Sequence, residues 1–277
     1  MMIARLKQLT KDLLTKTIWA YGPDEVVRQI RQCGFESGAT LVVHSSWHQH
    51  NGFRDKPADL IRALKTAVGN NGLLVMTSMP YHNMSSAEWL AKGKPMNVRR
   101  SPSMMGLVSE VFRRSEGVHR SLSATHPLLA WGKNAQDFIS GHQHTDRPFG
   151  PLSPFAKLLE RNALILGFDA PFSTFTFTHF VEDHLVDSLP TPLYEPELLA
   201  GKVVDYDGNE STQWLRVISP LANKLRREER LIAQLEGSQV LHRGRIGNTA
   251  LVWIRAQALL TGAQKLASEG AHFFDRP

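Results

Sequence analysis

The sequence predicts an α/β fold, a layered α/β/α arrangement in which helices cover both faces of a central mixed, largely parallel sheet. Three observations lead to this prediction. Short apolar runs rich in branched side chains alternate with amphipathic stretches of helical length. The first two runs are separated by one such stretch, an order that favours parallel pairing with a crossover helix. Both of these runs end in polar residues, as buried strands do when they reach the edge of a sheet.

Each expected element is a run of matching periodicity bounded by proline, glycine or polar residues. The expected core helices are 23–34, 56–69 and 103–115, and the expected buried strands are 39–46, 72–80 and 162–168. Pro23 suits the first turn of its helix, and Gly69 suits a C-cap. Together these elements predict a core over about 23–190.

Residues 191–277 are expected to form a C-terminal α+β elaboration on that core, so that 1–277 is a single domain. A hairpin is expected around Asp207-Gly208 in "VVDYDGNES". A strongly charged helix is expected over 219–237, and a last long helix over 249–270.

Composition indicates a globular cytoplasmic protein with neither membrane nor nucleic acid as partner. Of the 277 residues, 42% are hydrophobic and 21% charged, which is ordinary for a globular protein. The single Cys33 excludes an internal disulfide and a cysteine zinc cage, and it fits a reducing compartment. No apolar run approaches the roughly 18 residues of a membrane helix, and "MMIARLKQLTKDLL" does not read as a signal peptide. The net charge is +6, but the basic residues are scattered and no nucleic-acid module is recognisable.

The expected strand 39–46 ends in "HSS", and the expected strand 72–80 ends in "TSMP". In open α/β sheets, ligands bind beyond the carboxyl ends of the strands, where hydroxyls and free backbone N–H groups gather. Serine and threonine also begin turns, so the position alone leaves both explanations open.

The stretch "FTFTHFVEDH" at 175–184 combines two histidines with two acids. A zincin helix needs histidines four apart, whereas His179 and His184 are five apart, so no metal site is expected. His179 and Glu182 are three apart and share a helix face, which suits a base oriented by a carboxylate, with Thr176 three residues before. The alternative is the start of a surface helix with Thr178 as N-cap and acids in the first turns.

Six motifs stand in order along most of the chain: "LVVHSS" at 41–46, "ALKTAVGNNGLLVMTSMP" at 63–80, "SPSMMGLVSEVFRRSEGVHRS" at 101–121, "AWGKNA" at 130–135, "RPFGPLSPFAKLLE" at 147–160, and "ALILG" at 163–167 followed by Thr176, His179 and Glu182. Together they resemble the aminoglycoside 3-N-acetyltransferase family, which is distinct from the GNAT acetyltransferases. The resemblance implies direct transfer of an acetyl group from acetyl-CoA to an amine, without a metal.

In that reading His179 is the general base, Glu182 orients it, and Thr176 with strand-end N–H groups stabilises the oxyanion. A base is needed because an amine at neutral pH is mostly protonated. The resemblance also implies that the cofactor lies along two strand ends and the start of helix 103–115, with Arg120 near a phosphate. The residues expected to contact it are His44, Ser45, Ser46, Ser78, Met79, Pro80, Ser101, Ser103, Met104, Arg120 and Ser121.

The implied acceptor is a small-molecule amine, an aminoglycoside-like or other amino sugar. The alternatives are a biosynthetic amine or a sugar hydroxyl as acceptor, or a non-catalytic CoA-binding homologue; a homodimer is an assembly consistent with the family. The chain departs from the family where Ser123-Ala124 replace the usual His-Pro pair. The short basic segment 81–100 also offers few acids to a polycationic acceptor.

Overall fold

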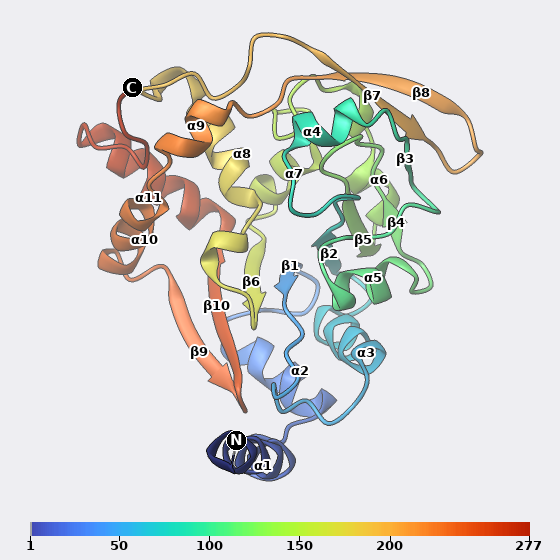
Figure 1. Cartoon of the computed structure of the whole chain (residues 1–277), viewed down its shortest axis with the longest axis vertical. Helices are drawn as coiled ribbons and strands as arrows, with labels where there is room; N and C mark the ends of the chain where they lie inside the picture. Colours follow the sequence, from blue (N-terminus) through green and yellow to red (C-terminus); the bar gives the residue numbers. More distant parts are fainter. Residues whose placement is uncertain (1) are drawn as a thin grey trace.

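A seven-stranded mixed sheet forms the centre of the molecule, and a three-stranded sheet lies at one end (Figure 1). The computed structural model describes residues 2–277. The large sheet has the order β4-β5-β2-β1-β6-β10-β9, and the small one the order β3-β7-β8. The strands of the large sheet are β1 Thr40–Ser45, β2 Leu73–Thr77, β4 His119–Arg120, β5 Leu128–Gly132, β6 Leu164–Phe168, β9 His242–Ile246 and β10 Thr249–Arg255. The strands of the small sheet are β3 Met96–Asn97, β7 Leu199–Val204 and β8 Glu210–Leu215.

The parallel strands occupy the middle of the large sheet. Strand β1 pairs in parallel with β2 on one side and with β6 on the other. The outer neighbours β5 and β10 run antiparallel to β2 and β6, and so do the edge pairs. The α/β class with a mixed sheet is confirmed, and the carboxyl ends of β1, β2 and β6 meet at one edge.

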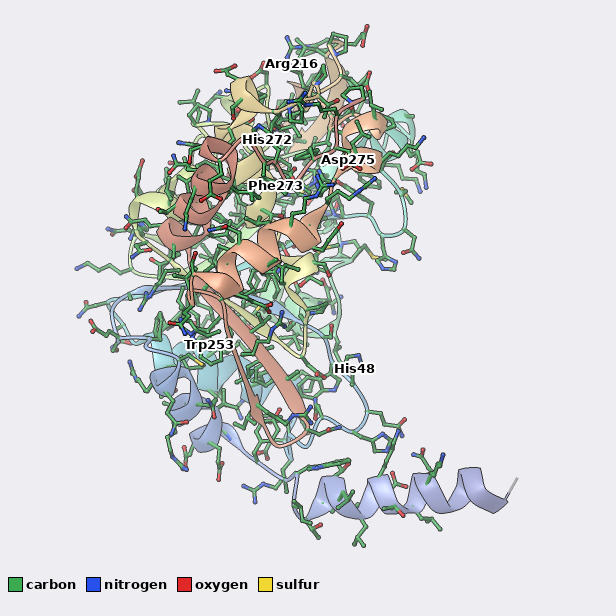
Figure 2. The ribbon with its side chains drawn as sticks, turned by 90° about the vertical axis from the view of Figure 1, so that its left-hand side faces the viewer. His48, Arg216, Trp253, His272, Phe273 and Asp275 are labelled. Atoms are coloured by element: carbon green, nitrogen blue, oxygen red, sulfur yellow. The ribbon has the colours of Figure 1, made fainter. Side chains whose placement is uncertain are left out.

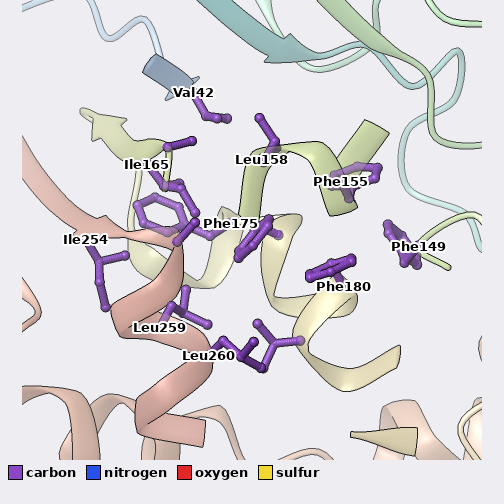
Figure 3. Close-up of a cluster of buried hydrophobic side chains, with 14 of the residues drawn as sticks. Val42, Phe149, Phe155, Leu158, Ile165, Phe175, Phe180, Ile254, Leu259 and Leu260 are labelled. Atoms are coloured by element: carbon purple, nitrogen blue, oxygen red, sulfur yellow. The ribbon is translucent and has the colours of Figure 1, made fainter. Parts of the chain in front are cut away.

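Helices cover both faces of this sheet. One face packs against α2 Pro23–Gln32, α3 Pro57–Val68 and α5 Leu107–Arg113. The other packs against α6 Ala135–Ile139, α7 Pro154–Glu160, α8 Phe177–His184, α10 Glu228–Gly237 and α11 Ala256–Ser268. Figure 3 shows part of this second core, where Val42 and Ile165 of the sheet meet Phe175, Leu259 and other buried side chains. Alternate strand residues therefore feed two separate apolar cores.

Apart from α1, the remaining helical segments are short. They are α1 Met2–Lys16, α4 Ser86–Ala91, α9 Pro220–Leu225 and three 3₁₀ turns at His142–His144, Phe172–Thr174 and Val186–Ser188. Helix α1 lies apart from the other helices at one end of the molecule (Figures 1 and 2), and Asp12 Oδ1 lies 2.8 Å from Nε2 of His50. No helix within residues 2–277 has the length and apolar character that a bilayer crossing requires.

The expected helix 249–270 is wrong in its first part. Residues 249–255 form β10, whose alternating side chains pair in register with β6, Leu251 opposite Phe168 and Arg255 opposite Leu164. The helix begins only at Ala256. The segment after residue 190 contributes β9 and β10 to the large sheet and is therefore part of the central core.

Two further expected helices are also corrected. The helix expected over 219–237 is interrupted at Arg226, whose extended backbone ends α9 before α10 begins. The helix expected over 103–115 begins at Leu107, because Gly106 precedes it with a φ of 111° that few other residues adopt. Ser101 and Ser103 therefore lie in the loop before the helix. The hairpin around Asp207-Gly208 is present as β7 and β8.

Gly167 in β6 leaves no space for a side chain. A Cβ there would overlap the carbonyl oxygen of Ala170 and approach Val252 to 2.7 Å and Phe175 to 3.1 Å. We expect Gly167→Ala to lower the free energy of unfolding by about 2 kcal/mol, measured by urea denaturation. The control is Gly237→Ala in α10, where a Cβ meets open space and should be neutral or slightly stabilising. Equal stability of the two variants would contradict this close packing.

Candidate active site

A cleft of about 720 Å³ opens where the carboxyl ends of β1 and β2 meet the start of α5 and α8. Thr77 ends β2 inside it, and Gly106 at the start of α5 forms part of its wall. The residues predicted from the sequence that line this cleft are His44, Ser45, Ser46, Met79, Met104, Thr176 and His179. The two polar strand ends and the Thr176/His179 motif are therefore brought to one place.

His179 and Glu182 are in contact on α8. His179 Nδ1 lies 2.9 Å from Oε2 of Glu182, whose side chain is fully buried, whereas that of His179 is 28% exposed. A carboxylate at this position accepts a hydrogen bond from Nδ1–H, which leaves Nε2 as the basic ring nitrogen. Phe149 packs against the imidazole with its ring centroid 5.1 Å away. The ring is thereby held on both sides.

Arg226 makes a two-pronged ion pair with the same carboxylate. Its Nε donates to Oε1 of Glu182 at 2.6 Å, and its Nη2 donates to Oε2 at 2.8 Å. Nη1 donates to Oδ1 of Asn223 at 2.7 Å, and the guanidinium lies 5.4 Å from the ring centroid of Phe274. Arg226 thus lies at the break between α9 and α10, from where its side chain reaches α8.

The C-terminal residues support this arrangement from outside. Asp275 accepts from Arg227 and Arg230, with nitrogen–oxygen distances of 2.6 Å in both pairs. Figure 2 shows Phe273 and Asp275 alongside the start of α10. Phe273 is buried in the same core as α8 and α11. The C-terminal residues therefore fix the position of the segment that contains Arg226.

Glu182 is ionised in this setting. Burial alone would raise the pKa of its carboxyl group, but the charge of His179 and its hydrogen bond, together with Arg226, lower it by more. The net result is a pKa below the ordinary value of 4.5. A buried charge of this kind is stable only while its partners remain in place.

His44 and Ser78 present unsatisfied polar atoms near the strand ends. His44 stacks on Phe175 with ring centroids 5.2 Å apart, and burial lowers the pKa of its imidazole to about 4, so the ring is neutral. Among the side chains that the structure describes, His44 Nε2 and Ser78 Oγ have no hydrogen-bond partner. Buried polar atoms are normally paired, so these two atoms suit a polar ligand at the strand ends.

Several residues expected at the cofactor lie elsewhere. Those outside the cleft lining are Ser78, Pro80, Ser101, Ser103, Arg120 and Ser121. Arg120 is 1% exposed, and its guanidinium donates to the backbone carbonyls of Ser78 and Ser101. Arg120 therefore lies outside the cleft, and its place near a phosphate stays a prediction. Ser121 Oγ is also occupied, since it accepts from the backbone N–H of Leu128 and lies 2.9 Å from Nδ1 of His142.

Five glutamates lie in or near the cleft, and only Glu88 belongs to segment 81–100; the other four were not predicted from the sequence. Glu228 and Glu229, at the start of α10, line the cleft. A neighbouring chamber of about 290 Å³ shares His179 and Asn223 with it. Beyond that chamber, a further hollow of about 710 Å³ is lined by three glutamates, Glu88, Glu195 and Glu197. The adjacent acids Glu228 and Glu229 are visible in the sequence, but they stand between Arg227 and Arg230, so the local net charge gave no signal.

The Ser123-Ala124 pair lies in the packing below the small sheet. Both residues are buried. The backbone carbonyl of Ala124 accepts from Nε1 of Trp89, and its N–H donates to Oε1 of Gln213.

Thr178 is not the N-cap that the alternative interpretation of "FTFTHFVEDH" expects. Helix α8 begins at Phe177, so Thr178 lies inside the helix, and its hydroxyl donates to the carbonyl of Phe175. Within the described part of the chain, no group of three or more His, Cys, Asp or Glu residues is placed to hold a metal ion.

A family model described as aminoglycoside 3-N-acetyltransferase matches residues 42–268, which is most of the chain. The chain belongs to this family. As a member of the aminoglycoside 3-N-acetyltransferase family it is an acyltransferase, as the sequence predicted. Aminoglycoside N(3)-acetyltransferase IV of Salmonella sp. is 31% identical over 66% of this chain and 67% of its own length. A prophage-derived aminoglycoside N(3′)-acetyltransferase-like protein of Bacillus subtilis, YokD, is 25% identical over 62% and 68% respectively.

Solved structures of the family share the fold. The apoenzyme of aminoglycoside acetyltransferase AAC(3)-IVa superimposes with a TM-score of 0.72 at 23% identity, covering 93% of this chain and 92% of that one. AAC-IIIb, in a binary complex with CoASH, has a TM-score of 0.74 at 22% identity, with 93% and 98% covered. A mutant of AAC(3)-IVa in complex with gentamicin has a TM-score of 0.74 at 23% identity, with 93% and 92% covered.

Proposed function

We propose that this enzyme transfers the acetyl group of acetyl-CoA to an amino group of an aminoglycoside, with His179 as general base. The observation that carries the proposal is the buried Glu182 carboxylate fixing His179 at the edge of an acidic cleft. Family membership supports the reaction class, and relatives bound to CoASH and to gentamicin support the two substrates.

The charge lining the cleft favours a polycationic acceptor. Five glutamates line the cleft and its two adjoining chambers, whereas one arginine does so, and it is paired with Glu182. This local excess of negative charge lies in a chain whose net charge is +6. Since clefts lined by one sign of charge concentrate ligands of the opposite sign, the site suits an aminoglycoside carrying several ammonium groups.

In the proposed step His179 Nε2 accepts a proton from the attacking amine. The amine nitrogen forms a bond to the acetyl carbon, the carbon–sulfur bond breaks, and the sulfur of CoA leaves with the electron pair. Glu182 stabilises the imidazolium, and Arg226 keeps Glu182 ionised and in position. Thr176, which lines the cleft wall in front of α8, would donate to the developing oxyanion.

The strand ends are where the acetyl donor would bind. His44 carries an unpartnered buried polar atom there, and Ser45, Ser46 and Met79 line the same wall. The neutral His44 would act as a hydrogen-bond donor or acceptor without adding charge. Arg120 does not line this cleft, and its two terminal nitrogens donate to backbone carbonyls.

The test is release of free thiol from acetyl-CoA in the presence of a panel of amines. We expect turnover with gentamicin and kanamycin at micromolar to millimolar KM, and product acetylated at the 3-amino group by NMR. Glucosamine, a singly charged amino sugar, is the control and should react far more weakly, because it cannot satisfy several glutamates. Preference for a neutral or hydroxyl acceptor would indicate a different acyltransferase, and CoA binding without any turnover would indicate a non-catalytic homologue.

A further inference from the structure

A pocket of about 340 Å³ lies away from the cleft, between the end of α5, the edge strand β4 and the small sheet. It has no lining residue in common with the cleft. Half of its lining residues are arginines, namely Arg99, Arg113, Arg114 and Arg120. The guanidinium carbon of Arg99 lies 5.5 Å from the ring centroid of Tyr206, another lining residue. The pocket thus combines strong positive charge with an aromatic wall.

The positive charge of this pocket is only partly balanced. Glu110 accepts from Arg113 at 2.7 Å and 2.8 Å, and from Nε of Arg114 at 2.6 Å. Among the side chains that the structure describes, neither Arg99 nor Arg120 forms an ion pair, so two of the four guanidinium groups share one carboxylate and two have none. Two arginines on a single carboxylate leave guanidinium donors free for another acceptor.

Arg120 adds an independent sign of a missing anion. Its side chain is 1% exposed, its two terminal nitrogens donate to neutral carbonyls, and its Nε has no partner among the described residues. Burial and the neighbouring Arg113 lower the pKa of Arg120 to about 9. A buried cation without a counter-ion is costly, and an anion in the adjoining pocket would relieve that cost.

We propose that this pocket is a phosphate-binding site, with Arg99 and Arg114 making the direct contacts and Arg120 contributing charge from beneath. Guanidinium groups match the geometry of phosphate oxygens in paired hydrogen bonds. Arg99, held over Tyr206, and Arg114, whose side chain is 71% exposed, both have solvent access at the pocket. The phosphate belongs either to the nucleotide end of CoA or to a separate phosphorylated metabolite. The first is within reach because Ser109 of the cleft and Arg113 of the pocket are one helical turn apart.

The experiment measures binding of pyrophosphate by titration calorimetry to the whole enzyme and to R99Q/R114Q. We expect the double variant to bind at least tenfold more weakly, as loss of charge-assisted hydrogen bonds implies. The matched control is R28Q/R31Q, two exposed arginines of α2, which lowers the net charge equally and should change affinity less than twofold. R99Q alone breaks no ion pair and should therefore fold normally, and it should weaken pyrophosphate binding several-fold. An equal loss in both double variants, or no pyrophosphate binding by the unaltered enzyme, would overturn the proposal.

A second arm identifies the source of the phosphate by comparing CoA with dephospho-CoA. If the pocket holds the 3′-phosphate of CoA, the unaltered enzyme prefers CoA, and R99Q/R114Q loses that preference. If the ligand is separate, R99Q/R114Q loses pyrophosphate but keeps its affinity for CoA. Either result supports the site and names its occupant.

Discussion

His179→Ala is expected to lower kcat for acetyl transfer by about 10²- to 10⁴-fold, the range for loss of a positioned general base. The Kd for CoA should stay within about twofold, because His179 lies on α8 and the predicted cofactor residues lie at the strand ends. Thiol release gives kcat, and calorimetry gives Kd. Loss of kcat with unchanged CoA binding separates a base from a residue that merely shapes the cleft.

His184→Ala is the matched control for this variant. His184 lies five residues further along the same helix and is exposed. It should retain nearly full activity, and a thermal melt of each variant would show whether α8 is intact. Full activity of His179→Ala would remove His179 from the mechanism and leave the amine to lose its proton to solvent.

Arg226→Met is expected to lower the free energy of unfolding by about 3 kcal/mol at pH 7, measured by urea denaturation. The cause is that Glu182, fully buried and ionised, loses the guanidinium charge and keeps only the hydrogen bond from His179. The free energy of unfolding of Arg226→Lys should lie between those of Arg226→Met and the unaltered enzyme, because an ammonium keeps the charge but not the paired hydrogen bonds. Arg216→Met, which breaks the exposed pair with Asp146, is the control and should cost less than about 1 kcal/mol.

The stability gap between Arg226→Met and the unaltered enzyme should also depend on pH. The folded-state pKa of Glu182 lies below its ordinary value of 4.5, so the stability that this group contributes is fully present above that value. That contribution is lost as the pH falls through the folded pKa. We therefore expect a larger gap at pH 7 than at pH 4. A gap that is small at pH 7 or constant across this range would show that Arg226 does not stabilise the ionised carboxylate.

Most of the core could be predicted from the sequence, because its signals are local. Helix α3 ends at Val68, one residue from the predicted end, since Gly69 supplies the backbone conformation of a helix end. His179 and Glu182 could likewise be paired on paper, because a separation of three residues places them on one helix face. Such features depend on nearest neighbours along the chain.

The errors lie where distant partners decide the structure. Residues 249–255 carry apolar side chains that suit either a helix or a strand, and pairing with β6 makes them a strand. Arg226 is 44 residues from Glu182, so no spacing rule could reveal that it would leave its helix to reach that carboxylate. The carbonyl partners of Arg120 likewise follow only from the fold.

Strand β10 pairs with β6 in the finished enzyme, yet it is made much later during synthesis. Until residues 249–255 emerge from the ribosome, β6 remains an edge strand whose five residues, "LILGF", are all destined for burial. An apolar unpaired edge can pair with other chains, so the nascent protein passes through an aggregation-prone stage. The finished sheet instead ends in β9, "HRGRI", whose first four residues are exposed and carry positive charge at Arg243 and Arg245. The β9–β10 hairpin thus replaces the apolar edge strand β6 with the charged edge strand β9, which is less prone to aggregate.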